Sequence, residues 1–447
     1  MASGLSQPGV ALSWDDMKIQ GKTAAEIFDC VRALRQSGQL RPGQVLPPVR
    51  DLAAELDINR NTVAAAYKRL AAAGIAATQG RLGTIIREPS GPGEQEGALS
   101  NSPLVDLASG NPNPAWLPDL TAALALRPYR PRLYGEPTVN AGLEDYARAW
   151  FAPDCLAPFE VNLTHGAVDA IERLLSSHLV AGDKVAVENP CFLSSINLLR
   201  IAGLLAVGVP VDAEGMQAQA LEAALGKGAQ AVILTPRAHN PTGCSLSAKR
   251  ARALARVLAR YPHVMVIVDD HFALLSNTEY HSVLPAGAQR WALVRSLTKA
   301  LGPDVRMAMV ASDAATSRQL RLRLASGTSW VSHLLQDMVE VTLGRPEVAR
   351  QMARAREDYA RRRQVLEDAL RAQGVPCAGQ GDGFNLWVPL DTDGQAVALA
   401  LAHRGWLVRH GDAFGVQEPV GGLRITLSSI EPAQCRDLAR DIRQSLG

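Results

Sequence analysis

Apolar side chains near the start of the chain recur every three or four positions. Three segments follow this spacing: Ile27 to Leu34, Val49 to Leu56 and Val63 to Leu70. Such spacing places the apolar side chains on one face of a helix and predicts three short amphipathic helices. Asn59 lies just before the third segment, where its side chain is suited to cap the first turn.

A β-hairpin is predicted directly after these helices. Its two strands are Ile75 to Thr78 and Thr84 to Arg87, and the glycine-containing sequence Gln79 to Gly83 forms the turn between them. Residues 15–88 are therefore expected to form one small domain of three helices and a hairpin.

The pattern changes after residue 103. Short apolar runs alternate there with longer helical stretches, which predicts an α/β domain with a largely parallel sheet over residues 104–447. The runs are Lys184 to Val187, Ala231 to Leu234, Val264 to Val268 and Trp291 to Val294. A long charged helix from about residue 347 onward indicates a smaller C-terminal subdomain over residues 347–447.

Residues 89–103 separate the two domains. Their sequence, PSGPGEQEGALSNSP, is dominated by proline, glycine, serine and polar residues, so it predicts a linker and not part of a core. As a flexible coil it would span about 20 Å. We expect it to let the small domain reorient relative to the large one.

Composition narrows the class of protein. A chain of 447 residues, 47% of them hydrophobic, is long enough for two or more packed cores. The net charge of +2, from 46 basic and 44 acidic residues, excludes a protein that coats polyanions with its whole surface. Residues 1–88 hold 11 basic and 8 acidic residues, so the positive surplus lies in the small domain.

Three further classes of feature are not expected. The six cysteines lie apart, without CxxC pairs or neighbouring histidines, so neither a metal site nor a disulfide framework is predicted. The longest apolar stretch, near Ile201 to Val211, is too short to cross a bilayer. We expect a cytoplasmic protein with reduced thiols and no membrane partner.

The second and third predicted helices have the arrangement of a helix-turn-helix. Such a motif places the first residues of its second helix against base edges in the major groove, and those residues here are Arg60, Asn61 and Thr62. Arginine and asparagine can pair bidentately with guanine and adenine. Further candidates are Arg50, Lys68 and Arg69 for phosphate contacts and Arg81 for the minor groove.

A family resemblance strengthens this interpretation. The sequence RPGQVLPPVRDLAAELDINRNTVAAAYKRLAAAGIAATQGRLGT resembles the winged helix-turn-helix of the GntR regulator family over its whole length. The resemblance implies operator double-stranded DNA as a partner. It implies DNA contacts by Arg50, Arg60, Asn61 and Thr62, and a wing at the turn from Gly80 to Gly83.

The large domain carries residues suited to pyridoxal 5'-phosphate (PLP). This cofactor needs a lysine amine, an acid beside the ring nitrogen and donors for its phosphate. Lys299 follows the apolar strand that ends near Val294, and Asp269 ends the strand Val264 to Val268. Both positions are suited to a cleft at strand ends.

Other segments supply the remaining contacts that PLP requires. The sequence Thr164-His165-Gly166-Ala167 opens a predicted helix whose amides can hold a phosphate, together with Ser296 and Arg306. Asn240 lies in a turn after a strand, within reach of the ring hydroxyl, and Phe192 offers an aromatic face to the ring.

In this order and spacing, these residues resemble the fold type I aminotransferase family across nearly all of residues 104–447. The resemblance implies that Lys299 is the Schiff-base lysine, Asp269 the ring-nitrogen partner and Arg306 a phosphate ligand. It also makes Arg424 the binder of a substrate carboxylate. Tyr134 matches the tyrosine that reaches the phosphate across a dimer interface, so a homodimer is implied.

A GntR-type winged helix followed by such a domain resembles the MocR subfamily of regulators. The subfamily commonly has tyrosine where this chain has His271, and frequently glycine where it has Ala308. Asn240 is the aminotransferase-like residue that many members lack.

The resemblance to the MocR subfamily implies a PLP-dependent bacterial transcription regulator. Such a regulator would respond to PLP, or to an amine or amino acid reacting at Lys299, in vitamin B6 or amine metabolism. Two alternatives stay open: an active aminotransferase with an accessory DNA-binding domain, and a cofactor-carrying interaction module without either activity.

Overall fold

The computed structural model describes residues 19–446 except 74, 79–82, 88–94, 98–101, 128–129, 156, 378 and 380. The chain forms two compact units, one within residues 1–93 and the other comprising most of residues 94–447. None of the described helices is both long and apolar enough to span a bilayer. None of the six cysteines, all of them among the described residues, forms a disulfide.

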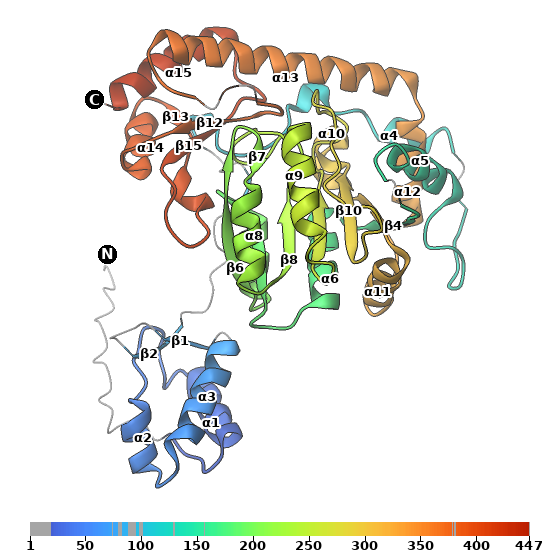
Figure 1. Cartoon of the computed structure of the whole chain (residues 1–447). Helices are drawn as coiled ribbons and strands as arrows, with labels where there is room; N and C mark the ends of the chain where they lie inside the picture. Colours follow the sequence, from blue (N-terminus) through green and yellow to red (C-terminus); the bar gives the residue numbers. More distant parts are fainter. Residues whose placement is uncertain are drawn as a thin grey trace, which may run out of the picture. The chain divides into compact units, whose positions relative to one another are not determined.

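The first unit is the predicted three-helix domain with its hairpin (Figure 1). Its elements are α1 (Ala24–Gln36), α2 (Val49–Glu55), α3 (Arg60–Ala72), β1 (Ala76–Thr78) and β2 (Thr84–Ile86). The apolar faces meet in one core that includes Ile27, Val31, Leu52, Val63 and Leu70. Helical periodicity therefore predicted this unit correctly, because each helix buries a single apolar stripe.

An eight-stranded sheet organises the second unit, in the order β4-β11-β10-β9-β8-β5-β6-β7. Its strands are β4 (Glu160–Thr164), β5 (Lys184–Asn189), β6 (Leu205–Asp212), β7 (Gly215–Met216), β8 (Ala229–Leu234), β9 (Met265–Asp269), β10 (Trp291–Ser296) and β11 (Ala308–Ser312). The five strands from β10 to β6 are parallel, while β11, β4 and β7 pair antiparallel. The sheet is thus mixed, with a parallel centre.

Helices cover both faces of this sheet. Alternating strand residues such as Val187 and Ile233 pack with α6 (Ala167–His178), α7 (Leu193–Ile201) and α11 (Ala314–Ala325). Their neighbours Ala186 and Val232 pack on the other face with α8 (Ala218–Gly226) and α9 (Ala248–Leu258), which Figure 1 shows across the sheet. Strands buried on both faces explain the continuous apolar runs of the sequence.

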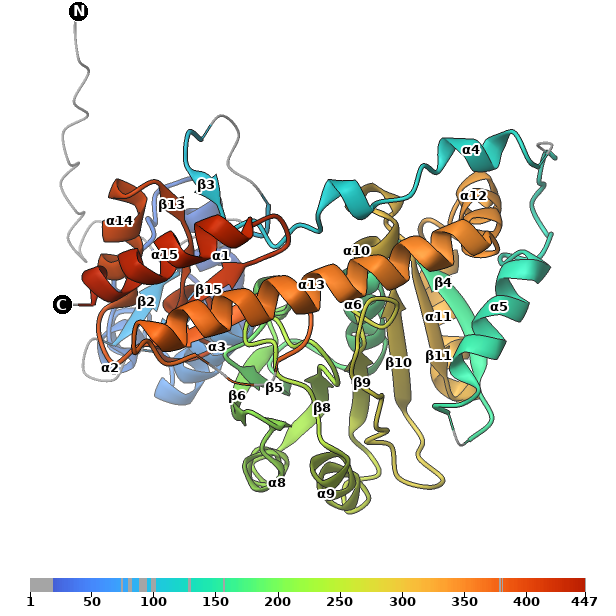
Figure 2. The same ribbon diagram turned by 90° about the horizontal axis from the view of Figure 1, so that it is seen from above.

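The remaining elements lie beside the sheet. They are β3 (Val105–Asp106), α4 (Thr121–Leu124), α5 (Ala141–Phe151), α10 (Thr298–Leu301), α12 (His333–Leu343) and the 27-residue α13 (Pro346–Ala372). Short 3-10 turns within the described part of the unit are Pro114–Trp116, Pro303–Val305 and Gly411–Phe414. Figure 2 shows α13 running from α12 toward α14 and α15.

The expected C-terminal subdomain is built on a small antiparallel sheet of β12 (Asn385–Pro389), β15 (Gly422–Thr426) and β14 (Arg409–His410). Its helices are α14 (Gly394–His403) and α15 (Pro432–Ser445). Strand β13 (Trp406–Leu407) pairs with β3, from the beginning of the unit. The subdomain therefore recruits residues that lie far from 347–447 in the sequence.

Candidate functional site

A cavity of about 260 Å³ lies where the parallel strands end. Carboxyl ends of parallel strands meet at one edge of a sheet, so loops from distant parts of the chain converge there. Nine of the predicted cofactor-binding residues line the cavity, and Arg424, the predicted carboxylate binder, lies beside them. Those lining the cavity are Gly166, Ala167, Phe192, Asn240, Asp269, His271, Ser296, Lys299 and Arg306, while Arg424 contacts Asn240.

Lys299 lies in the short helix α10, just after β10. Its Nζ donates a hydrogen bond to the backbone oxygen of Gly110 at 2.7 Å. Burial lowers the pKa of Lys299 to about 8, although the charge of Glu96 opposes this shift. At pH 7 about a tenth of the amine is therefore neutral, and so nucleophilic, which is far more than for an unperturbed lysine.

Two adjacent carboxylates at the end of β9 have different surroundings. Asp270 is fully buried and binds both Arg237, at 2.6 Å, and Arg295, at 3.0 Å. Asp269 faces the cavity, and its Oδ1 has no hydrogen-bond partner among the described residues. Burial and the neighbouring Asp270 raise the pKa of Asp269 to about 7. Asp269 is the carboxyl group available to a ligand.

One end of the cavity is suited to an anion. Gly166 precedes α6, so the first amides of that helix face the cavity. Arg306 adopts a left-handed backbone conformation with φ 42°, and a Cβ added at Gly166 would lie 3.8 Å from its Cζ atom. Ser296 adds a hydroxyl group, which bonds to Thr298 at 2.8 Å.

His165 lies outside the cavity lining, although its neighbours Gly166 and Ala167 belong to it. Its backbone N–H donates to Asp169 at 3.0 Å, and its ring is about one-third exposed. His271 does line the cavity, where burial and the charge of Lys299 lower its pKa to about 4. The His271 ring is therefore neutral at physiological pH.

A carboxylate of the chain itself occupies the neighbourhood of Arg424. Glu96 forms an ion pair with Arg424, whose side chain is completely buried in β15. Asn240 Nδ2 donates to the same Glu96 oxygen at 2.9 Å, and Arg424 donates to Asn240 Oδ1 at 3.1 Å. This contact could not be predicted from the sequence, because Glu96 belongs to the polar segment 89–103 that was predicted as a linker.

A second pair that was not predicted from the sequence is formed by Glu188 and His239. Glu188, near the end of β5, lies 3.2 Å from His239, and both side chains are buried. Burial lowers the pKa of His239, but Glu188 outweighs this effect and the pKa rises to about 10. The Glu188 carboxylate also accepts hydrogen bonds from the Thr235 amide at 3.1 Å. Only the fold brings these residues together.

Tyr134 does not line the cavity. It is 92% exposed, and its ring lies 5.5 Å from that of Trp330. The adjacent Leu133 is 72% exposed. In the single chain this segment therefore presents apolar surface outward.

The predicted DNA-reading residues lie at the start of α3. Asn59 caps this helix by accepting a hydrogen bond from the Asn61 amide at 2.8 Å. Arg60 and Asn61 are exposed and Thr62 is half-buried. Arg50 and Lys68 are also exposed, whereas the Arg69 guanidinium lies 5.8 Å from the Phe28 ring centroid. Arg81 and most of the predicted wing lie outside the described residues.

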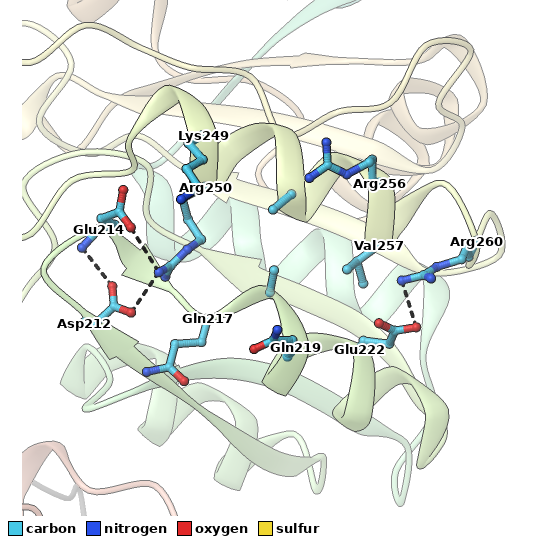
Figure 3. A pocket seen from close by; sticks show the side chains of 12 residues that line it. Asp212, Glu214, Gln217, Gln219, Glu222, Lys249, Arg250, Arg256, Val257 and Arg260 are labelled. Carbon is cyan, nitrogen blue, oxygen red and sulfur yellow. Dashed lines mark hydrogen bonds and ion pairs between the residues drawn. The ribbon is translucent and has the colours of Figure 1, made fainter.

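A larger, open groove of about 810 Å³ runs between α8 and α9 (Figure 3). Arg250 bonds there to Asp212 at 2.8 Å, and Arg260 to Glu222 at 2.8 Å. These charges stabilise one another at the surface. Lys249 lines the groove, but the groove's carboxyl groups, those of Asp212, Glu214 and Glu222, are not buried as Asp269 is, so the groove is not the candidate site.

Comparison with known proteins agrees with this geometry. Residues 103–442 match the family described as aminotransferase class I and II, and residues 23–86 match the bacterial regulatory proteins of the gntR family. The chain is 55% identical over 428 residues to the vitamin B6 salvage pathway transcriptional repressor PtsJ of Salmonella typhimurium, covering 96% of this chain and 99% of that protein.

Two further relatives are more distant. The pyridoxine biosynthesis transcriptional regulator PdxR of Corynebacterium glutamicum is 25% identical over 399 residues, covering 85% of this chain and 86% of its own. A kynurenine aminotransferase from Pyrococcus horikoshii superposes with a TM-score of 0.70 at 19% identity, covering 77% and 91% of the two chains. The chain therefore belongs to the aminotransferase class I and II family and carries a gntR-family domain before it, which is the layout of the MocR subfamily of regulators.

Proposed function

We propose that this chain is a PLP-responsive transcription regulator that binds operator double-stranded DNA through α3. One observation supports the proposal most strongly. Lys299 and Asp269 line the same cavity, and Asp269 Oδ1 has no hydrogen-bond partner among the described residues. The gntR-family domain supplies the DNA-binding half. The names of PtsJ and PdxR support regulation of vitamin B6 metabolism.

The described residues fit PLP. Asp269 would pair with the ring nitrogen, because a buried carboxyl group without a partner gains a charge-assisted hydrogen bond there. Gly166, Ala167, Ser296 and Arg306 would hold the phosphate, and Phe192 would contact the ring face. When bound, PLP would supply an aldehyde group to the Lys299 amine. Lys299 would present that amine, and Asn240 would orient the ring hydroxyl.

We also propose a homodimer in the cytoplasm. Leu133 and Tyr134 present exposed apolar surface, which a second copy would cover. Tyr134 would then reach the phosphate of the other subunit's cofactor. Two winged helices on one dimer predict two operator half-sites with a fixed spacing.

The test is binding of the purified protein to its own upstream DNA at fixed salt, with and without PLP. Allosteric coupling of about 1–3 kcal/mol predicts a change in operator affinity of about 5- to 150-fold. Lys299→Ala should bind the operator without responding to PLP. Wild-type affinity that does not change with PLP would contradict PLP as the signal, and absence of specific binding would contradict the regulator itself.

A further inference from the structure

Glu96 forms an ion pair with the residue that was predicted to bind the carboxylate of an amino acid ligand. Arg424 is the predicted carboxylate binder, and its guanidinium pairs with Glu96. Asn240 donates to the same oxygen at 2.9 Å. An arginine and an amide therefore already hold one carboxylate inside the cavity, and this carboxylate belongs to the chain.

The segment around Glu96 is fixed on both sides. The Gln95 backbone oxygen accepts a hydrogen bond from Arg409 at 2.9 Å, and the Gly97 amide donates to Ser109 at 2.9 Å. Gly110 leaves room for the inserted side chain, because a Cβ there would lie 2.5 Å from Glu96 Oε2. Three consecutive residues of the predicted linker thus dock onto the second unit.

Charge favours this arrangement. Burial alone would raise the pKa of Glu96, but Arg424 and the hydrogen bonds lower it below its usual value. The Glu96 carboxylate is therefore ionised and compensates the fully buried Arg424. Glu96 and Lys299 line the same cavity, and the charge of each one shifts the pKa of the other.

We propose that Glu96 is a specificity-determining residue that closes the carboxylate position, so that the site accepts PLP but excludes amino acids. The proposal rests on the proposed function and names the ligand class of that site. A tethered group competes at an effective concentration in the millimolar range. Arg424 Nε has no partner among the described residues, so the guanidinium keeps a donor for an incoming carboxylate once Glu96 is removed.

The experiment compares the wild type with Glu96→Ala, Glu96→Gln and the matched control Gln95→Ala, whose exposed side chain belongs to the same segment. Each protein is loaded with PLP and titrated with L-alanine or L-aspartate while the absorbance of the bound cofactor is recorded. The wild type and Gln95→Ala should respond weakly. Both Glu96 variants should respond at concentrations at least ~10-fold lower, because the tethered competitor is absent.

Ethylamine, which has no carboxylate, is the chemical control. It should react equally with the wild type and the Glu96 variants, since it does not need Arg424. Equal amino acid responses in wild type and variants would overturn the proposal, as would a gain for ethylamine as large as the gain for alanine. Glu96→Gln preserves the side-chain shape, so its amino acid titration tests the proposal if Glu96→Ala fails to fold.

A second measurement does not depend on PLP. Hydrogen exchange in the cofactor-free protein should be faster at the Gly97 amide in Glu96→Ala than in the wild type or Gln95→Ala. Equal exchange rates would show that Glu96 does not hold this segment and would contradict the proposal. If the wild type fails to bind PLP but exchange still depends on Glu96, the proposed function fails while the Glu96–Arg424 contact stands.

Discussion

The winged-helix unit and the cofactor-binding unit position their candidate functional residues by different physical means. In the first, Arg60 and Asn61 are neighbours in sequence at the start of α3, and the adjacent Asn59 caps that helix. In the second, Glu96 and Arg424 form a pair across 328 positions of the chain. Residues that are adjacent on one helix are brought together when that helix forms. Residues at the ends of several strands come together only when the complete sheet has formed.

The largest expected effect tests how strongly the cofactor unit depends on its buried charges. Asp270→Asn removes the shared partner of two buried arginines, Arg237 and Arg295. Breaking such a buried ion pair costs about 3–5 kcal/mol of the free energy of unfolding. Chemical denaturation measures this loss, and a change below ~1 kcal/mol would show that the network does not stabilise the unit.

The pH dependence of cofactor attachment tests the environment of Lys299. Its pKa is lowered to about 8, and only the neutral amine attacks an aldehyde. The rate at which cofactor-free protein binds PLP should therefore fall about tenfold for each pH unit below about 8, and level off above it. Stopped-flow absorbance measures the rate. A rate still rising beyond about pH 10 would indicate an unperturbed lysine.

Asp269→Asn tests whether Asp269 contributes to ligand binding, whereas its neighbour Asp270 contributes to stability. The variant loses a charged hydrogen-bonding group facing the cavity, so PLP affinity should weaken by about 1.5–3 kcal/mol. Unfolding should be affected far less than in Asp270→Asn, because Asp269 Oδ1 has no partner among the described residues. Spectroscopic titration measures the affinity, and unchanged PLP binding would remove Asp269 from the site.

Arg60→Ala tests the winged-helix unit in the same way. Loss of one bidentate base contact should weaken operator binding by about 1–3 kcal/mol and relax sequence preference at one position. PLP binding should not change. Arg32→Ala, at an exposed arginine of α1 paired with Asp29, is the matched control. Equal losses in both variants would point to general electrostatics instead of base recognition.

The smallest expected effect concerns the cap of α3. Asn59→Ala removes the hydrogen bond to the Asn61 amide and should lower the stability of the winged-helix unit by about 1 kcal/mol. The unfolding transition of the cofactor unit should stay where it is. A simultaneous shift of both transitions would show that the two units do not unfold independently.

Much of the fold followed from local patterns. Helical spacing at Val63 and Leu70 predicted α3, and the apolar run that ends before Asp269 predicted β9. The predicted largely parallel sheet is mixed, because β11, β4 and β7 pair antiparallel at its edges. The direction in which two strands pair depends on how the connecting segments return the chain to the sheet. This direction cannot be read from the apolar run of a single strand.

The amino-acid sequence by itself determined the two units, the helix that presents Arg60 and the segments that supply Lys299 and Asp269. These features follow from periodicity, capping and the family resemblance of short motifs. Only the tertiary structure decided that two arginines bind Asp270 while Asp269 faces the cavity, and that Glu96 forms an ion pair with Arg424. These outcomes depend on burial and on contacts between residues that are distant in the sequence. A carboxylate in an exposed linker is solvated by water, whereas leaving the same carboxylate unpaired in a buried core costs free energy.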